Sequence, residues 1–252
     1  MPEVGKKYKK VQEAYAEKGA AALYQEYVVG GTSLWDLLKY ELFINFTAGI
    51  PGALGLWIRK TLYPRMISQC GKGIVWGRDM VLRYPQKIRI QDLSIFDDGC
   101  VLDAKGDGNQ GIFIGKSCMF GRQTILGCKN ADIVIGDRVG IGAHCILHAV
   151  DTSPVHIEDN TVIGPNVYLA AGGNYHFERT DIPIGQQGVD CKGGIRIGKN
   201  SWIGANTVIL DGVTLGNDVI VGAGSVVAKD LPPFAIAVGN PARVVRMRLE
   251  ST

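Results

Sequence analysis

The sequence predicts an all-β core, wound as a parallel solenoid of short strands, that follows a helical segment at the N-terminus. Three observations support this fold class. An apolar residue recurs every six positions over most of the chain, glycine supplies 34 of the 252 residues, and the first 70 residues lack the six-residue period. Apolar residues make up 46% of the chain and charged residues 20%, which is compatible with a packed core.

Residues 1–70 form the predicted helical segment. The clearest helical stretches are Ala14-Tyr15, residues 20–23 and residues 34–46. Gly30-Gly31 followed by Thr32-Ser33 predicts a break and an N-cap, and Ile50-Pro51-Gly52 predicts a second break.

Two roles are open for this segment. Its helices would cap the end of the solenoid, where the core otherwise meets water. Residues 34–65 would also suit peripheral contact with an anionic membrane, because aromatic and aliphatic residues lie beside bases. Those bases are Arg59, Lys60 and Arg65, together with Lys6, Lys7, Lys9 and Lys10. The two roles are compatible.

The six-residue repeat begins clearly at Ile90 and continues to Val227. The 18 repeats group into six coils of three, which start at Ile90, Ile114, Ile135, Ile157, Ile197 and Leu215. A period of six suits a short strand followed by a corner, three times per coil, with the apolar residue stacked inside. Val75 and Val81 are interpreted as an incomplete first coil. The solenoid is assigned to residues 71–234, and residues 235–252 to a partial coil and a tail.

All insertions fall at one corner of the coil. Successive coils start 24, 21, 22, 40 and 18 residues apart, so the insertions contain 6, 3, 4, 22 and no residues. The longest gives a loop over residues 170–196. Long loops in compact domains are disproportionately functional, so this loop is the predicted catalytic loop.

The repeats, together with Ser201-Trp202-Ile203-Gly204-Ala205-Asn206, resemble the hexapeptide-repeat acyltransferases. The likeness is greatest to bacterial sugar and polysaccharide O-acetyltransferases that use acetyl-CoA. Residues 221–227 and Gly239-Asn240-Pro241-Ala242-Arg243 resemble that family's C-terminal signature. The resemblance implies a left-handed parallel β-helix and a homotrimer with acetyl-CoA bound between neighbouring prisms. It also implies a sugar hydroxyl as acceptor, on a cell-envelope polysaccharide or its lipid-linked precursor.

His176 lies inside the long loop and is the candidate general base. Imidazole titrates near pH 6.5, so it is suited to removing a hydroxyl proton near neutral pH. The family similarly places a catalytic histidine in such a loop. The resemblance also assigns the oxyanion donor to the backbone amide of Ala205. Glu178 or Asp181 would orient the imidazole, and Gln186 and Gln187 are weaker candidates for acceptor hydroxyls.

Other candidates concern the acyl donor and the acceptor. Coenzyme A carries several phosphates, so cations should line its groove. The resemblance gives Lys229, Arg243 and Arg246 as basic contacts of coenzyme A, and Ala223 and Ala228 as small positions along its pantetheine path. Trp202, which lies outside the apolar stack, is also a candidate for the acetyl or acceptor pocket, and a place at a trimer interface is the alternative. His144 and Asp151 are candidates for acceptor binding.

Several alternatives stay open at this stage. Another acceptor, such as serine, an amino sugar or an antibiotic, and a non-catalytic scaffold both fit the repeat. A metal site at His144, His148 and His156 is not favoured, because no carboxylate motif accompanies them, and we expect no metal. The six cysteines form no CxxC pair, and Cys100, Cys118 and Cys145 occupy a small inward slot.

Charge and the N-terminus bear on partners and location. The net charge of +3 is too small to indicate nucleic-acid binding. The first residues do not resemble a signal peptide, so we expect a cytoplasmic protein, with contact at the inner face of the cell membrane as an open question.

Overall fold

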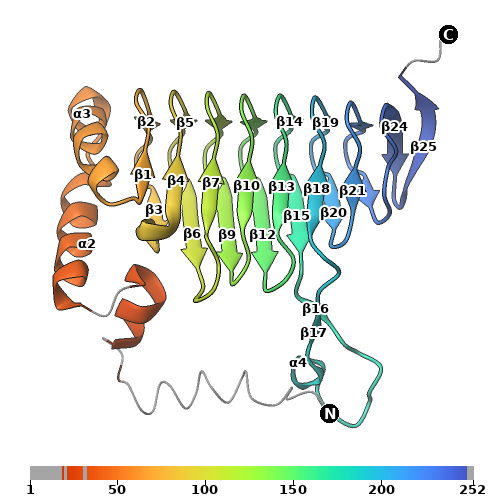
Figure 1. Cartoon of the computed structure of the whole chain (residues 1–252), viewed down its shortest axis with the longest axis horizontal. Coiled ribbons are helices and arrows are strands. Elements are labelled where there is room, and N and C mark those ends of the chain that lie inside the picture. Colours follow the sequence, from red (N-terminus) through yellow and green to blue (C-terminus); the bar gives the residue numbers. More distant parts are fainter. Residues whose placement is uncertain (1–18, 20–21, 31–32, 249–252) are drawn as a thin grey trace.

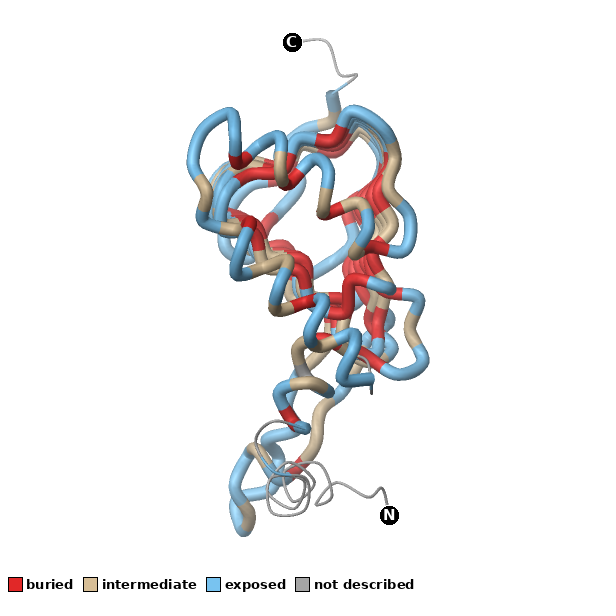
Figure 2. The backbone as a smooth tube through the Cα atoms, turned by 90° about the vertical axis from the view of Figure 1, so that its left-hand side faces the viewer, coloured by how far each residue is buried: buried red, intermediate tan, exposed pale blue. Residues whose placement is uncertain are grey.

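The computed structural model describes residue 19, residues 22–30 and residues 33–248, and it shows a three-sided parallel β-helix (Figures 1 and 2). Helices lie at one end, and a strand pair lies at the other. The predicted fold class, a parallel solenoid of six-residue repeats after a helical segment, is confirmed. The helical stretch expected at Ala14-Tyr15 and the break at Gly31-Thr32 lie outside the described residues.

Three parallel sheets form the sides of the prism, and the chain visits sheet A, sheet B and sheet C in turn. Sheet A contains β1 (Gln69–Cys70), β4 (Ile88–Ile90), β7 (Ile112–Ile114), β10 (Ile133–Ile135), β13 (Val155–Ile157), β18 (Ile195–Ile197) and β21 (Thr214–Leu215). Sheet B contains β2 (Val75–Trp76), β5 (Ile95–Phe96), β8 (Met119–Phe120), β11 (Gly140–Ile141), β14 (Val162–Ile163), β19 (Trp202–Ile203), β22 (Ile220–Val221), β24 (Ala235–Gly239) and β25 (Ala242–Met247). Sheet C contains β3 (Val81–Arg83), β6 (Val101–Lys105), β9 (Ile125–Lys129), β12 (Ile146–Val150), β15 (Tyr168–Ala171), β20 (Val208–Leu210) and β23 (Val226–Val227).

The core consists of the first residue of each repeat, stacked on its equivalent in the next coil. Ile135 pairs with Ile157, Ile163 with Ile203, and Leu169 with Ile209, and all six side chains are buried. Every insertion lies between a strand of sheet C and the next strand of sheet A, so one edge of the prism carries all the loops.

The first coil differs from the prediction by one residue. Trp76 and Leu82 point inward and are buried, whereas Val75 and Val81 lie on the outside. Trp76 stacks on Phe96, with ring centroids 5.3 Å apart, and Phe96 on Phe120 at 4.7 Å. The register of the first coil therefore continues the inward aromatic stack of the next two coils.

The helical segment closes the N-terminal end of the prism. It comprises η1 (Gln25–Val29), α2 (Leu34–Thr47), α3 (Gly52–Leu62) and η2 (Tyr63–Arg65). Ser33 caps α2 as expected, because its hydroxyl accepts a hydrogen bond from the Trp35 N–H at 3.1 Å. Tyr63 is fully buried and packs edge-on against Trp76, so the segment covers the open core.

Arg59 does not belong to a basic surface, contrary to the sequence interpretation. It is 2% exposed, and its guanidinium donates to the carbonyls of Trp76, Thr47 and Ile50 at 3.1, 3.1 and 2.8 Å. The end of a helix leaves carbonyl groups without intrahelical partners. Arg59 therefore ties the end of α2 to the first coil and is unavailable to a membrane.

At the opposite end, β24 continues sheet B and β25 folds back antiparallel on it. The turn between them, Asn240-Pro241, contains a cis peptide bond. No helix within the described ranges is both long enough and apolar enough to span a bilayer.

Candidate functional site

The long insertion forms an arm, residues 172–194, that projects from the edge between sheets C and A (Figure 1). Its two halves pair as the short strands β16 (Asn174–Tyr175) and β17 (Val189–Asp190). The helix α4 (Ile184–Gln187) lies near its tip. The arm is therefore an ordered ribbon and not an open loop.

Asp211, which the sequence analysis did not single out, fastens the base of the arm. Its carboxylate is 7% exposed and accepts hydrogen bonds from Asn174 Nδ2 at 3.2 Å and from the backbone N–H groups of Lys192 at 2.7 Å and Gly194 at 2.9 Å. Ser153 Oγ donates a fourth at 3.0 Å. One side chain thus holds both ends of the arm. The signal that would have found it is a carboxylate two residues after the inward Ile209, at the end of the coil that follows the long insertion.

His176 lies just beyond β16 and is exposed. Its backbone N–H donates to the Gly188 carbonyl at 3.0 Å, which extends the ribbon by one bond. Phe177, beside it, is 70% exposed. The imidazole therefore stands on a pinned ribbon with its side chain in the open, as a base that meets an incoming substrate requires.

The neighbouring polar groups of the arm bond elsewhere. Asp181 forms an ion pair with Arg179, whose hydrogen bond holds the pKa of that carboxyl below its usual value. Glu178 accepts from the Phe177 N–H at 3.1 Å. Gln187 is buried and bonds the backbone of Arg179 through both its oxygen and its nitrogen. In this chain, therefore, Asp181 and Gln187 stabilise the arm itself.

Ala205 lies on a different edge, between sheets B and C. On the edge between sheets A and B, the equivalent N–H groups of Lys116 and Lys199 donate to side-chain oxygens of Asp137 and Asn217 in the next coil. The residue above Ala205 is Ala223, which has no side-chain oxygen, and no acceptor among the described residues pairs with the Ala205 N–H. The amide is thus open, as an oxyanion donor must be.

The two candidates for binding the acceptor substrate, His144 and Asp151, lie on different edges of the prism. His144 is exposed on the same edge as Ala205, two coils earlier, which corresponds to about 10 Å at the usual strand spacing. Asp151 lies at the foot of the arm, where its carboxylate accepts from Asn130 Nδ2 at 3.2 Å.

The candidate contacts for coenzyme A also fall into two groups on different parts of the prism. Trp202 is 56% exposed on the outer face of sheet B, and Ala223 lies on the edge between sheets B and C. Arg243 and Arg246 are exposed on β25, at the end of the same sheet. Ala228 and Lys229 are exposed at the edge between sheets C and A, close to the level of β23. Sheet C separates the two groups within one chain.

The structure gives no support to the metal alternative. His148 lies on the outside of sheet C and His156 on the outside of sheet A, so their side chains diverge. Burial, with a nearby base in each case, lowers the pKa of both imidazoles. No cluster of three metal-ligating side chains occurs within the described part of the chain.

The cysteines of the small inward slot are core residues. Cys100, Cys118 and Cys145 have no exposed area, and burial raises the pKa of each thiol. Their thiols donate weak hydrogen bonds to carbonyls of the next coil, such as Gly121. None of them is placed to act as a nucleophile.

Two faces of the prism are apolar on the outside. Along sheet B the outward residues of successive coils are Val75, Ile95, Met119, Gly140, Val162, Trp202 and Ile220. Along sheet C the outward residues nearest the edge with sheet B are Val81, Val101, Ile125, Ile146, Tyr168, Val208 and Val226. A second outward row of sheet C is more polar and includes Arg83, Asp103 and His148. Sheet A shows Gln69, Arg89, Phe113, Val134, His156, Arg196 and Thr214 and is more polar. The apolar faces flank the edge that carries Ala205.

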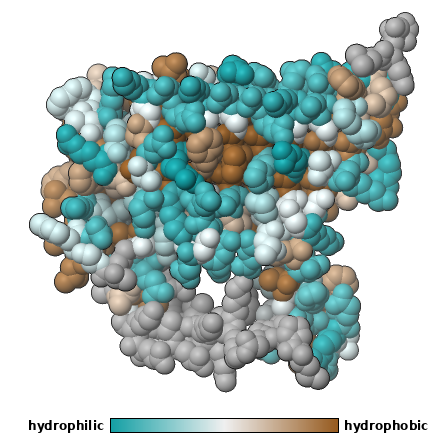
Figure 3. Space-filling view, viewed as in Figure 1, coloured by the Kyte–Doolittle hydropathy of each residue, from teal (hydrophilic) through white to brown (hydrophobic). Residues whose placement is uncertain are grey.

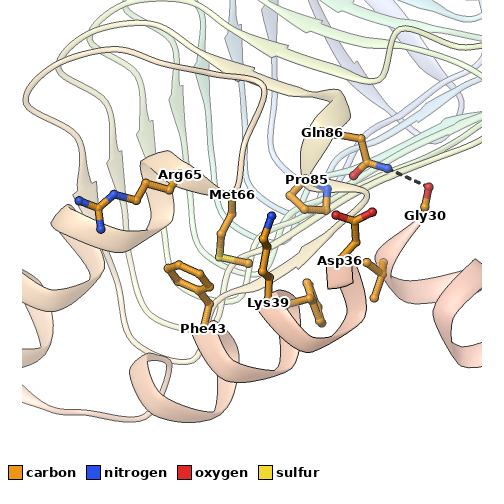
Figure 4. Close-up of a pocket in the computed structure, with 10 residues that line it drawn as sticks. Gly30, Asp36, Lys39, Phe43, Arg65, Met66, Pro85 and Gln86 are labelled. Carbon is orange, nitrogen blue, oxygen red and sulfur yellow. Dashed lines mark hydrogen bonds between the residues drawn. The ribbon is translucent and has the colours of Figure 1, made fainter. Parts of the chain in front are cut away.

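A pocket of about 530 Å³ lies away from these edges, between α2, η2 and the short helix η3 (Pro85–Lys87) (Figure 4). Its lining includes Lys39, Phe43, Arg65, Met66 and Gln86. It belongs to the helical end of the molecule, and none of the candidate catalytic residues lines it.

Two stretches of the chain match models of known protein families. Residues 194–229 match the family described as bacterial transferase hexapeptide (six repeats), and residues 132–171 match the hexapeptide repeat of succinyl-transferase. These two stretches therefore carry the hexapeptide repeat. The two matches stop and resume on either side of the arm, so the arm is an insertion into the hexapeptide repeat.

Curated relatives with similar sequences are acetyltransferases by name. The galactoside O-acetyltransferase of Escherichia coli K12 is 41% identical over 116 residues, which are 44% of this chain and 55% of that protein. A putative acetyltransferase of Schizosaccharomyces pombe is 37% identical over 97 residues, 38% of this chain and 45% of that protein. The alignments thus span about half the length of these relatives.

Among solved structures, a galactoside acetyltransferase in complex with coenzyme A is 23% identical, with a TM-score of 0.44, and covers 94% of this chain and 90% of its own. A mutant of AntD, an N-acyltransferase from Bacillus cereus, in complex with dTDP-4-amino-4,6-dideoxyglucose and coenzyme A is 21% identical, with a TM-score of 0.49, and covers 73% and 86%.

Proposed function

We propose that this hexapeptide-repeat protein is an acetyl-CoA-dependent O-acetyltransferase that acts on a sugar hydroxyl. The observation that carries the proposal is the pinned arm, which interrupts the repeat and presents an exposed histidine. The acetyltransferase names of its sequence relatives support the reaction class. The acceptor we propose is a hydroxyl of a cell-envelope polysaccharide or of its lipid-linked precursor.

The reaction needs one proton transfer and one acyl transfer. His176 takes the proton of the acceptor hydroxyl while its oxygen attacks the thioester carbonyl. The open Ala205 amide donates to the oxyanion that forms. The carbon–sulfur bond then breaks, and the proton on His176 passes to the sulfur of coenzyme A. An acetyl ester and free coenzyme A are the products, and no protein nucleophile is needed.

A second chain completes the proposed site. His176 and Ala205 lie on different edges, with the whole of sheet C between them. A homotrimer brings the arm of one prism to the edge between sheets B and C of its neighbour. The apolar outer faces of sheets B and C flank that edge and supply surfaces for the contact. Trp202, Ala223, Arg243 and Arg246 would then line the acetyl-CoA groove.

Exchange of His176 tests the proposal directly. His176→Ala should lower acetyl transfer to sugar hydroxyls roughly 10²- to 10⁴-fold, measured as release of free coenzyme A, while acetyl-CoA still raises the melting temperature. The matched control is His156→Ala, on the outside of sheet A, which should leave turnover unchanged. Full turnover in His176→Ala, or no acetyl-CoA-dependent stabilisation of the unaltered chain, contradicts the proposal.

The proposed location follows from the acceptor. A glycan that is built on a lipid stays at the bilayer, so we also propose a cytoplasmic enzyme whose residues 34–65 contact the inner face of the cell membrane.

A further inference from the structure

The helical end of the prism exposes many large apolar side chains. On α2 these are Leu34, Trp35, Leu38, Leu42 and Phe46, and on α3 they are Leu54 and Trp57, each more than half exposed. We call these seven residues the helix face. Apolar atoms are visible at this end of the molecule in Figure 3. Contiguous apolar surface of this kind marks a site of contact with another body.

The helix face is a stripe and not the lining of a pocket. Leu34, Leu38, Leu42 and Phe46 follow one another at intervals of four, so they lie along one side of α2 over about 18 Å. The opposite side, with Tyr40 and Thr47, is buried against the molecule. Because α2 is apolar on both sides, its outer side also needs an apolar environment.

The shape of the surface favours a fluid partner. The pocket of Figure 4 is lined from α2 by Asp36, Lys39, Tyr40 and Phe43, none of which belongs to the helix face. The side chains of the helix face instead stand out toward solvent. Protruding leucine, phenylalanine and tryptophan side chains suit insertion among acyl chains, whereas a folded protein partner would need complementary hollows.

Cations accompany the helix face. Lys39, Lys60 and Arg65 are exposed, and none of them forms an ion pair with the described residues. In Figure 4, Lys39 points into the pocket, and Asp36 lies near it. The other acid of α2, Glu41, is engaged by Tyr24 and Asn45. Tryptophan and lysine beside an apolar stripe are typical of segments that lie in the interface of an anionic bilayer.

We propose that the helix face docks on an anionic phospholipid bilayer, with Lys60 and Arg65 at the level of the lipid phosphates. This deepens the proposed function, and one step rests on the proposed trimer. If the three prisms run parallel, their helical ends point the same way, so one flat membrane contacts all three at once. Multivalent contact raises the overall affinity well above that of a single helix pair.

Flotation of the full chain with vesicles tests the proposal. We expect it to float with vesicles of 30% phosphatidylglycerol in phosphatidylcholine and to bind phosphatidylcholine alone more weakly. The triple variant Trp35→Ser, Leu38→Ser, Phe46→Ser should lose on the order of 1,000-fold in vesicle partitioning, because each of the three buried apolar side chains contributes roughly a factor of ten. Lys60→Gln with Arg65→Gln should lower the preference for phosphatidylglycerol by roughly 10-fold or more.

The matched control is Leu93→Ser, which removes an equally exposed leucine from a corner of the prism and should leave flotation unchanged. The proposal is overturned if the full chain does not float. The helix face would then be covered by something other than a bilayer, such as a second copy of the chain or residues 1–18. An assembly larger than a trimer, dissolved by the triple variant, would identify the second copy. Acetyl-CoA-dependent stabilisation and turnover on a water-soluble acceptor, measured on the same variants, report separately on the proposed enzyme.

Discussion

The anchor of the arm at Asp211 leads to a quantitative prediction for Asp211→Asn. The carboxylate oxygen Oδ2 accepts three hydrogen bonds, and Oδ1 accepts one from the Gly194 N–H at 2.9 Å. Asparagine has the same shape but only one acceptor atom. The free energy is lowest when the asparagine oxygen takes the place of Oδ2 and keeps its three hydrogen bonds. The NH₂ group then takes the place of Oδ1 and faces the Gly194 N–H. One buried backbone donor is then unpaired, which costs about 1–3 kcal/mol.

This cost should appear as easier opening of the arm. At 1.4 kcal/mol per factor of ten, hydrogen exchange of the arm amides should accelerate roughly 5- to 150-fold. The amides of β12 and β20, which belong to the stacked coils, should exchange as before. The control is Asp137→Asn, since Asp137 also accepts from a backbone N–H, that of Lys116 at 2.8 Å, but on the edge between sheets A and B.

Measurements of turnover show whether Asp211 acts by positioning His176 or by stabilising the whole fold. Asp211→Asn should lower kcat in the unaltered chain, because His176 is held less well. It should have little further effect in the His176→Ala background, where there is no imidazole to position. The reasoning is refuted if exchange in the arm does not change, if β12 and β20 accelerate equally, or if the two substitutions lower kcat independently.

Three further predictions concern the prism. Arg59→Met should lower the free energy of unfolding by about 3 kcal/mol, measured with urea, because several buried carbonyls lose their donor. Trp76→Ala should cost about 3–5 kcal/mol and Val75→Ala less than about 1, and the reverse order would contradict the register of the first coil. Burial raises the pKa of the Cys100 and Cys128 thiols to about 11 and about 12. These thiols stay neutral in the folded state while the unfolded thiols ionise, so unfolding free energy should fall above pH 9 by about 1.4 kcal/mol per pH unit for each, and Cys100→Ala should make the decline shallower.

The coils from Ile90 onward could be predicted because the repeat constrains them strongly. A slip of one residue would turn every inward side chain outward. The apolar pattern did not determine the register of the first coil. Val75 and Trp76 are both apolar, and the outer faces of sheets B and C also carry apolar residues, so either residue could point inward. Only the stacking of Trp76 on Phe96 distinguishes the two registers, and that contact depends on how coils superpose.

The candidate site was predictable to a different degree. The arm follows from counting residues between repeats, and His176 follows from the arm. The bonds around it do not, because they join residues far apart in sequence, as in the 58 residues between Ser153 and Asp211. Arg59 shows the same limit. Its sequence neighbours suggest a basic surface, but its role comes from carbonyl groups that converge only after α2 and α3 pack on the first coil.

The three edges of the prism differ in chemistry, and the difference bears on how the site is completed. On the edge between sheets A and B, the third repeat position carries charged or amide side chains that cap the neighbouring coil, as Asp137 does for Lys116. On the edge between sheets B and C, the same position is held by Ala143, Pro165, Ala205 and Ala223. Three of these four residues are alanines, so no long side chain covers the backbone at this position, although His144 is exposed on the same edge. The edge between sheets C and A carries the arm. The projecting arm and the edge of small residues lie on opposite sides of sheet C, and this separation is the reason for proposing that the chemistry uses residues from two chains.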